Sequence, residues 1–126
     1  MAGDDIRVGL SGAGGNVRNR HIPGFQKAGG VDIAAVANRS LESGRSVADQ
    51  FNIPDVYANW RELLEDESLD AVCIGTWPYM HRTMVLAALD AGKHVLTEAR
   101  MANTAAEARD MLAASQAHPN KVCQLT

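Results

Sequence analysis

The sequence predicts an α/β fold in which one doubly wound, mainly parallel sheet of six strands carries helices on both faces. Short apolar runs containing β-branched residues alternate with longer segments of helical period, which is the rhythm of a parallel sheet. The first of these runs leads directly into a glycine-rich turn, and several helical segments begin with capping signals. Because the chain has 126 residues, it has room for one domain with a buried core, and we assign residues 1–126 to it.

The expected strands are short apolar runs. They lie at residues 5–11, 31–37, 56–57, 70–75, 93–97 and 121–125. Two of the helices between them have the Ser/Thr/Asn-x-x-Glu pattern of a capping box, formed by Asn59 with Glu62 and by Thr104 with Glu107, the latter opening a helix to about residue 116.

Other local signals bound the remaining helices. Ser40 precedes a helix at 41–51, and Gly92 ends a helix that starts near residue 79. Pro23 and Gly24 predict a kink or break near residues 21–22, since proline interrupts the helical hydrogen bonds.

The glycine-rich turn predicts a dinucleotide site. Gly12 permits a tight turn, and Gly14 has no Cβ to hold a pyrophosphate away from the backbone N–H groups at the start of the following helix. The third position of the Gly-x-Gly-x-x-Gly pattern holds Val17 instead of a small residue, which predicts altered packing of helix against strand. The expected phosphate-binding residues are Gly12, Ala13, Gly14, Gly15, Asn16 and Val17.

Charge in the segment after this turn has two interpretations. Residues 16–28 contain Arg18, Arg20 and Lys27 but no acid, although a helix N-terminus normally favours carboxylates. The cations either form a solvated face or favour an anion such as a phosphate in the turn.

The residues after the second strand bear on the choice of cofactor. An Asp or Glu here would bind the adenosine ribose 2′-OH, whereas the chain has Asn38, Arg39 and Ser40. An arginine and a hydroxyl can bind a 2′-phosphate through charge-assisted hydrogen bonds, which favours NADP(H) over NAD(H). In the alternative, Ser40 only caps the next helix and Arg39 faces solvent, and either cofactor is compatible.

The segment after the fourth strand lies where doubly wound sheets bind ligands, so we expect Gly75, Thr76, Trp77 and Pro78 to line the cofactor site. Thr76 is a candidate cap for the next helix, with Pro78 in its first turn. Trp77 and Tyr79 supply aromatic surface, and for Trp77 both ligand contact and simple packing stay open.

His81 follows this segment. We include it among the cofactor-site candidates, although a histidine on the surface of a helix is the more ordinary reading than a catalytic base.

Composition excludes several classes of function. Twelve Lys and Arg against fifteen Asp and Glu give a net charge of −3, and no basic run is present to follow a nucleic acid backbone. Cys73 and Cys123 stand alone in apolar runs, which predicts buried reduced thiols and no metal site. The N-terminal apolar run is too short for a signal sequence or membrane span, so we expect a cytoplasmic protein.

Several segments together resemble the N-terminal NAD(P)-binding Rossmann domain of the Gfo/Idh/MocA oxidoreductases, over essentially the whole chain. They are the turn from Gly12, residues 21–25, 56–57 and 60–64, residues 70–72, His81 and residues 87–96. The resemblance implies the cofactor-binding half of an oxidoreductase acting on a CH–OH or carbonyl group of a sugar- or cyclitol-like substrate. It also implies that Glu98 lies near the nicotinamide ribose and that residues 75–78 line that half of the cofactor.

The sequence departs from the family at the end of the fifth strand. The family typically has Glu-Lys-Pro there, whereas this chain has Glu98, Ala99 and Arg100. Alanine has no proton to give and a guanidinium stays protonated, so we assign no catalytic residue. Arg100 either orients an anionic group or makes a surface ion pair. A non-catalytic nucleotide-binding or regulatory module, or a redox-neutral lyase or hydrolase with bound NAD(P), stays open as an alternative.

The resemblance also implies a C-terminal α/β substrate domain, which we expect to be absent from this chain. The isolated chain is then expected to bind cofactor without turnover, and a small-molecule substrate would need the missing domain. Homo-oligomer formation is left open.

Overall fold

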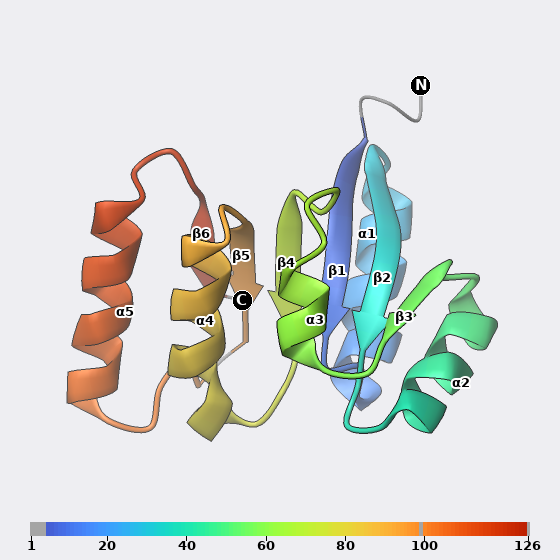
Figure 1. The fold of residues 1–126 in the computed structure, drawn as a ribbon, viewed down its shortest axis with the longest axis horizontal. Coiled ribbons are helices and arrows are strands. Elements are labelled where there is room, and N and C mark those ends of the chain that lie inside the picture. The colour runs from blue at the N-terminus through green and yellow to red at the C-terminus, as the bar shows by residue number, and fades with distance from the viewer. Residues whose placement is uncertain (1–4, 99, 126) are drawn as a thin grey trace.

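The computed structural model describes residues 5–98 and 100–125. Its core is one sheet in which every neighbouring pair of strands is parallel, with the order β3-β2-β1-β4-β5-β6 (Figure 1). The strands are β1 (Ile6–Ser11), β2 (Val31–Ala37), β3 (Asp55–Tyr57), β4 (Ala71–Ile74), β5 (His94–Thr97) and β6 (Cys123–Leu125). The predicted doubly wound sheet is therefore confirmed, with β2 at its predicted bounds.

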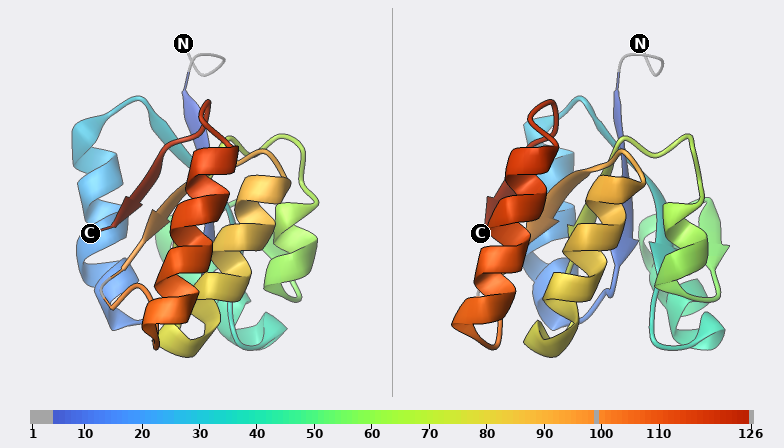
Figure 2. Two further views of the ribbon diagram at one scale, coloured as in Figure 1. Left: turned by 90° about the vertical axis from the view of Figure 1, so that its left-hand side faces the viewer. Right: turned by 60° about the vertical axis from the view of Figure 1, so that its left-hand side comes forward.

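Helices cover both faces of the sheet. They are α1 (Ile22–Ala28), α2 (Leu41–Phe51), α3 (Trp60–Leu64), α4 (His81–Asp90) and α5 (Ala105–Ala117), with a π-helical turn η2 (Val17–His21) and a 3₁₀ turn η3 (Pro78–Met80). Figure 2 shows α3, α4 and α5 side by side on one face and α1 on the opposite face.

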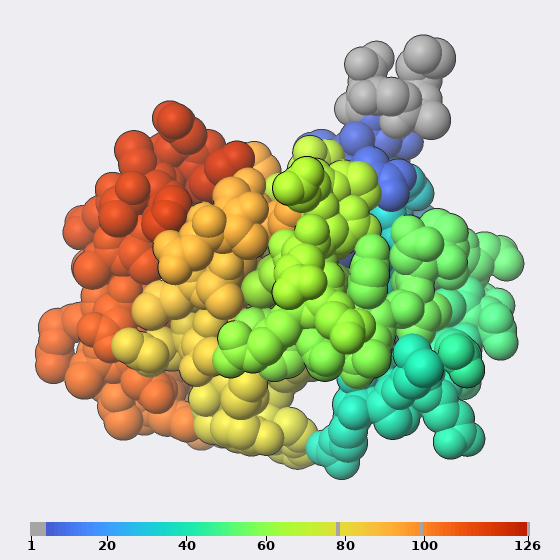
Figure 3. Space-filling model, in the orientation of Figure 1, coloured from blue at the N-terminus to red at the C-terminus, as the bar shows by residue number. Residues whose placement is uncertain are grey.

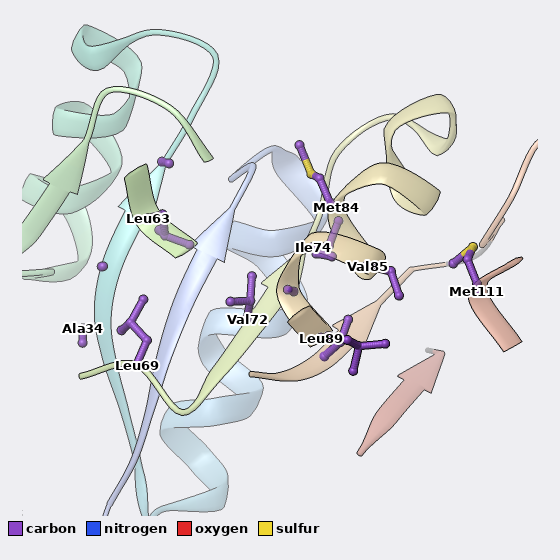
Figure 4. Close-up of a cluster of buried hydrophobic side chains, with 13 residues drawn as sticks. Ala34, Leu63, Leu69, Val72, Ile74, Met84, Val85, Leu89 and Met111 are labelled. Carbon is purple, nitrogen blue, oxygen red and sulfur yellow. The ribbon is translucent and has the colours of Figure 1, made fainter. Parts of the chain in front are cut away.

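The hydrophobic core is divided between these two faces. One cluster joins α3, α4 and α5 to the sheet through Leu63, Leu89 and Met111, among others (Figure 4). The second joins η2, α1 and α2 to the opposite face through residues such as Ile22 and Val47. Because both faces are covered, the central strands are buried on both sides, which is typical of parallel sheets.

Of the two hydrogen bonds that each predicted capping box requires, the one accepted by the cap side chain is confirmed at the starts of α3 and α5. Asn59 Oδ1 accepts a hydrogen bond from the N–H of Glu62, and Thr104 Oγ1 accepts one from the N–H of Glu107. The returning glutamate bonds reach the residue before each cap, at the N–H groups of Ala58 and Asn103, instead of the cap itself.

The helix after the glycine turn is irregular where Pro23 predicts it. The chain does not leave the helix there but changes from the π turn to α1 between His21 and Ile22, and the Ile22 N–H donates to the carbonyl of Val17. Pro23 is tolerated because it lies in the first turn of α1, where no intrahelical partner is needed for its nitrogen. Gly92, with φ at +78°, follows the end of α4 as predicted.

The two cysteines are free, and Cys73 is buried as expected whereas Cys123 is only half-buried, because it lies on the edge strand β6. Burial, together with the charge of Glu98, raises the pKa of the Cys73 thiol to about 12. Among residues 5–98 and 100–125 no helix is long and apolar enough to cross a membrane, and no three His, Cys, Asp or Glu side chains gather as a metal site.

Candidate dinucleotide-binding site

A cavity of about 590 Å³ lies beyond the carboxyl ends of the central strands. Figure 3 shows the surface hollowed between the cyan segment that follows β2 and the yellow segment that precedes α4. Its lining comes from the glycine turn and from the segments after β2, β3, β4 and β5. The lining residues are Ser11–Val17, Ala37–Arg39, Ala58–Trp60, Gly75–Trp77, Tyr79, Met80, Met84 and Glu98.

The glycine turn has the conformation that its sequence predicts. Gly12 has φ at +85°, and a Cβ placed on it would lie 2.6 Å from Cγ2 of Thr76. A side chain is therefore excluded there by both backbone conformation and space. A Cβ on Gly14 or Gly15 would meet nothing within 4 Å, so the backbone at these two positions is open to a ligand.

Val17 fills the position that a third glycine takes in the usual pattern. It is buried, and its Cγ2 atom would lie 2.2 Å from a Cβ placed on Gly75. The small residue that allows close approach is thus on the neighbouring strand end instead of on the helix.

At one end of the cavity, the residues after β2 divide into two roles. Asn38 Oδ1 accepts a hydrogen bond of 3.2 Å from the N–H of Ala13 and so braces the glycine turn, while Arg39 is exposed and lines the cavity. Ser40 lies outside the lining, and its hydroxyl accepts from the N–H of Ser43 as the N-cap of α2. Ser40 therefore caps a helix in the structure, as the alternative interpretation of this residue predicted.

Three residues after β3 also line this end and were missed from sequence. They are Ala58, Asn59 and Trp60, and the guanidinium of Arg61 lies 4.3 Å from the Trp60 ring centroid. The sequence feature that could have identified them is their position directly after a parallel strand, where such sheets bind ligands.

At the other end, Trp77 and Tyr79 are 63% and 62% exposed, so Trp77 does not pack in the interior. The prediction that Thr76 caps α4 is wrong. The Thr76 hydroxyl donates to Met84 Sδ at 3.6 Å, and Met80 takes the N-cap position without a side-chain bond. The 3₁₀ turn η3, which includes Pro78, separates Thr76 from the helix start.

His81 is not a surface residue, contrary to expectation, and it does not line the cavity. Its side chain is buried, and Nε2 donates to the carbonyl of Thr76 at 2.9 Å, while Nδ1 has no partner within the described parts of the chain. His81 therefore fixes the loop that lines the cavity.

The side chain of Glu98 is held beside the cavity by two side chains from the N-terminal part of the chain, Asn16 and His21. Asn16 Nδ2 donates to Glu98 Oε2, and His21 Nε2 lies 3.3 Å from the same oxygen. The π turn brings Asn16 and His21 together, since its hydrogen bonds join residues five apart. His21 was missed as a site residue because this pairing is not visible in the local sequence. Arg100 is exposed, and Ala99 lies outside the described residues.

Taken together, the strand order, the glycine turn after β1 and the cavity at the β1–β4 switch point define a dinucleotide-binding Rossmann domain. The open backbone at Gly14 and Gly15 fits the pyrophosphate of such a cofactor. The chain belongs to the Gfo/Idh/MocA family, whose model, described as an oxidoreductase family with an NAD-binding Rossmann fold, matches residues 6–125. It is thus an NAD(P)-binding domain of that family.

Three similar proteins illustrate the relationship. An inositol 2-dehydrogenase/D-chiro-inositol 3-dehydrogenase of Shouchella clausii is 35% identical over 95% of this chain and 35% of its own length. A 1,5-anhydro-D-fructose reductase of Ensifer adhaerens is 36% identical over 87% of this chain and 33% of its own. A 3-ketoreductase from Actinomadura kijaniata, solved with TDP-benzene and NADP, has a TM-score of 0.87 at 25% identity over 95% of this chain and 38% of its own.

The chain spans about a third of the length of the curated relatives it matches.

Proposed function

We propose that this chain binds NADP(H) in preference to NAD(H), as the cofactor-binding part of an oxidoreductase that acts on a CH–OH or carbonyl group of a sugar- or cyclitol-like substrate. The observation that carries the proposal is the glycine turn, whose open backbone faces a cavity with Arg39 at one end. An arginine at this position matches the 2′-phosphate that distinguishes NADP(H).

Each part of the lining has a role toward the cofactor. The backbone of residues 12–15 would hold the pyrophosphate, helped by the nearby charge of Arg18, whose Nε lies 3.4 Å from the carbonyl of Gly14. Arg39 would hold the 2′-phosphate, while Gly75, Thr76, Trp77 and Glu98 would line the nicotinamide half. When bound, the nicotinamide ring supplies the hydride acceptor or donor, and the protein orients it.

The substrate class rests on the relatives, two of which act by name on a cyclitol or an anhydro sugar. Because these relatives are about three times as long as this chain, we assign the substrate pocket to a C-terminal domain outside these 126 residues. As part of the same proposal, we place the protein in the cytoplasm and consider association with further copies of itself.

A non-catalytic nucleotide-binding module is the second candidate. Ala99, at the position where the family typically has lysine, favours it, because alanine cannot transfer a proton. A redox-neutral lyase or hydrolase with bound cofactor would also tolerate this residue.

Isothermal titration calorimetry of the chain with NADPH and with NADH tests the main proposal. We expect both to bind, NADPH more tightly. Failure of both to bind would overturn the function, and a preference for NADH would overturn the role of Arg39.

A further inference from the structure

We propose that Glu98 makes this site bind the oxidised, positively charged form of the cofactor more tightly than the reduced form, and that Asn16 and His21 hold the carboxylate in position for this. The inference rests on the proposed function and concerns its nicotinamide half.

Charge is distributed unequally along the cavity. Among the described residues that line it, Glu98 is the only carboxylate and Arg39 the only cation. Arg39 follows β2, and Glu98 follows β5, so the two charges lie on opposite sides of the glycine turn, which follows β1. A dinucleotide with its pyrophosphate on that turn places one nucleoside at each end.

The two ends of the cofactor carry charges opposite to those of Arg39 and Glu98. The adenosine half of NADP carries an additional phosphate, and the nicotinamide ring is a cation when oxidised. Electrostatic complementarity therefore places the adenosine half at Arg39 and the nicotinamide half at Glu98.

The Glu98 carboxylate is constrained as well as charged. Its side chain is only 16% exposed and that of His21 only 12%. Asn16 donates to Oε2, where His21 Nε2 also lies within reach, and Oε1 would lie 3.2 Å from a Cβ on Gly75. Hydrogen bonds to an ionised carboxylate are stronger than those between neutral groups, so these two partners hold the Glu98 side chain in one orientation.

Reduction removes the positive charge of the nicotinamide ring but leaves the phosphates unchanged. A carboxylate fixed near the ring therefore attracts the oxidised form alone, and partial burial weakens its screening by solvent. Arg39, in contrast, faces the same adenosine phosphate in both forms, so it contributes equally to the binding of each.

The experiment measures the dissociation constants of NADP⁺ and NADPH by calorimetry at one fixed pH and ionic strength. The variants are Glu98→Gln, which keeps shape and removes charge, and Arg39→Met as the matched control. We expect Glu98→Gln to weaken NADP⁺ binding by about three- to tenfold while NADPH binding changes by less than about twofold. Arg39→Met should weaken both forms by the same factor.

His21 is tested as a positioning residue by rescue. His21→Gln keeps an N–H donor and should retain the wild-type ratio of the two dissociation constants, whereas His21→Leu should shift that ratio in the direction of Glu98→Gln. A tenfold change in the ratio equals a shift of about 30 mV in the reduction potential of the bound two-electron couple, which provides a second readout.

Equal weakening of NADP⁺ and NADPH by Glu98→Gln would overturn the inference while leaving the proposed function intact, because both forms would still bind. An unchanged ratio in His21→Leu would overturn the role of His21. Failure of the wild-type chain to bind either form would overturn the proposed function itself.

Discussion

Val17 occupies the space that the missing side chain of Gly75 leaves, since a Cβ on Gly75 would lie 2.2 Å from Cγ2 of Val17. This contact joins the π turn η2 to the segment after β4, and both residues line the cavity. It explains how the chain accommodates a valine where the dinucleotide pattern usually has a third glycine.

Replacing Gly75 with alanine should therefore destabilise the domain. We expect Gly75→Ala to lower the free energy of unfolding by about 1–3 kcal/mol through overpacking, measured by urea denaturation. The double variant with Val17→Ala should recover part of the loss, because it removes the colliding methyl groups. Gly24→Ala is the control, since a Cβ there meets nothing within 4 Å. A Gly75→Ala domain as stable as wild type would contradict this packing account.

Reversing the charge of Arg39 should change cofactor preference. We expect Arg39→Asp to weaken NADPH binding by about tenfold or more and to affect NADH binding much less, because only NADPH carries the 2′-phosphate. Calorimetry measures both constants. Arg45→Asp, on the exposed side of α2 and outside the cavity lining, is the matched control and should change neither. Equal effects of Arg39→Asp on the two cofactors would contradict a 2′-phosphate contact.

Ser40 should affect stability without affecting cofactor binding. Its hydroxyl caps α2 by accepting from the N–H of Ser43 at 3.1 Å, so Ser40→Ala should cost about 1 kcal/mol of unfolding free energy. The dissociation constant for NADPH should stay within about twofold of wild type, which is less than 0.5 kcal/mol. A large loss of affinity without a loss of stability would instead place the hydroxyl on the cofactor.

The hydrogen bond from Tyr57 to Asp66 should make a contribution to the free energy of unfolding that depends on pH. The phenol donates to Asp66 Oδ2 at 2.7 Å, and this bond raises the pKa of Tyr57 to about 12. Hydrogen bonds from Ser68 and Tyr57 lower the pKa of Asp66 below its ordinary value.

The sign for each partner follows from these shifts. The raised Tyr57 pKa stabilises the fold below pH 10, and this contribution is lost as the pH rises toward about 12. The lowered Asp66 pKa stabilises it above the ordinary value near 3.8, and that contribution is lost as the pH falls through the lower folded value. We expect Tyr57→Phe to cost about 1 kcal/mol between about pH 5 and 9, and the cost to shrink at both extremes. Urea denaturation across pH measures it, and a cost that does not vary with pH would contradict the proposed linkage.

The sequence by itself determined the elements and the glycine turn. Strands, helix caps at Ser40, Asn59 and Thr104, and the tight turn at Gly12 depend on residues within a few positions of one another. Local periodicity, capping and backbone freedom are properties of such short segments, so they can be recognised without the fold.

Only the tertiary structure decided which side chains share the site. The contact of Gly75 with Val17 and the meeting of Glu98 with His21 join residues far apart in the chain. Burial of His81, and the separation of Arg39 from Ser40 into cavity lining and helix cap, likewise depend on how the elements pack. These outcomes follow from close packing between distant segments, in which one missing Cβ or one helical turn of altered pitch changes which atoms meet.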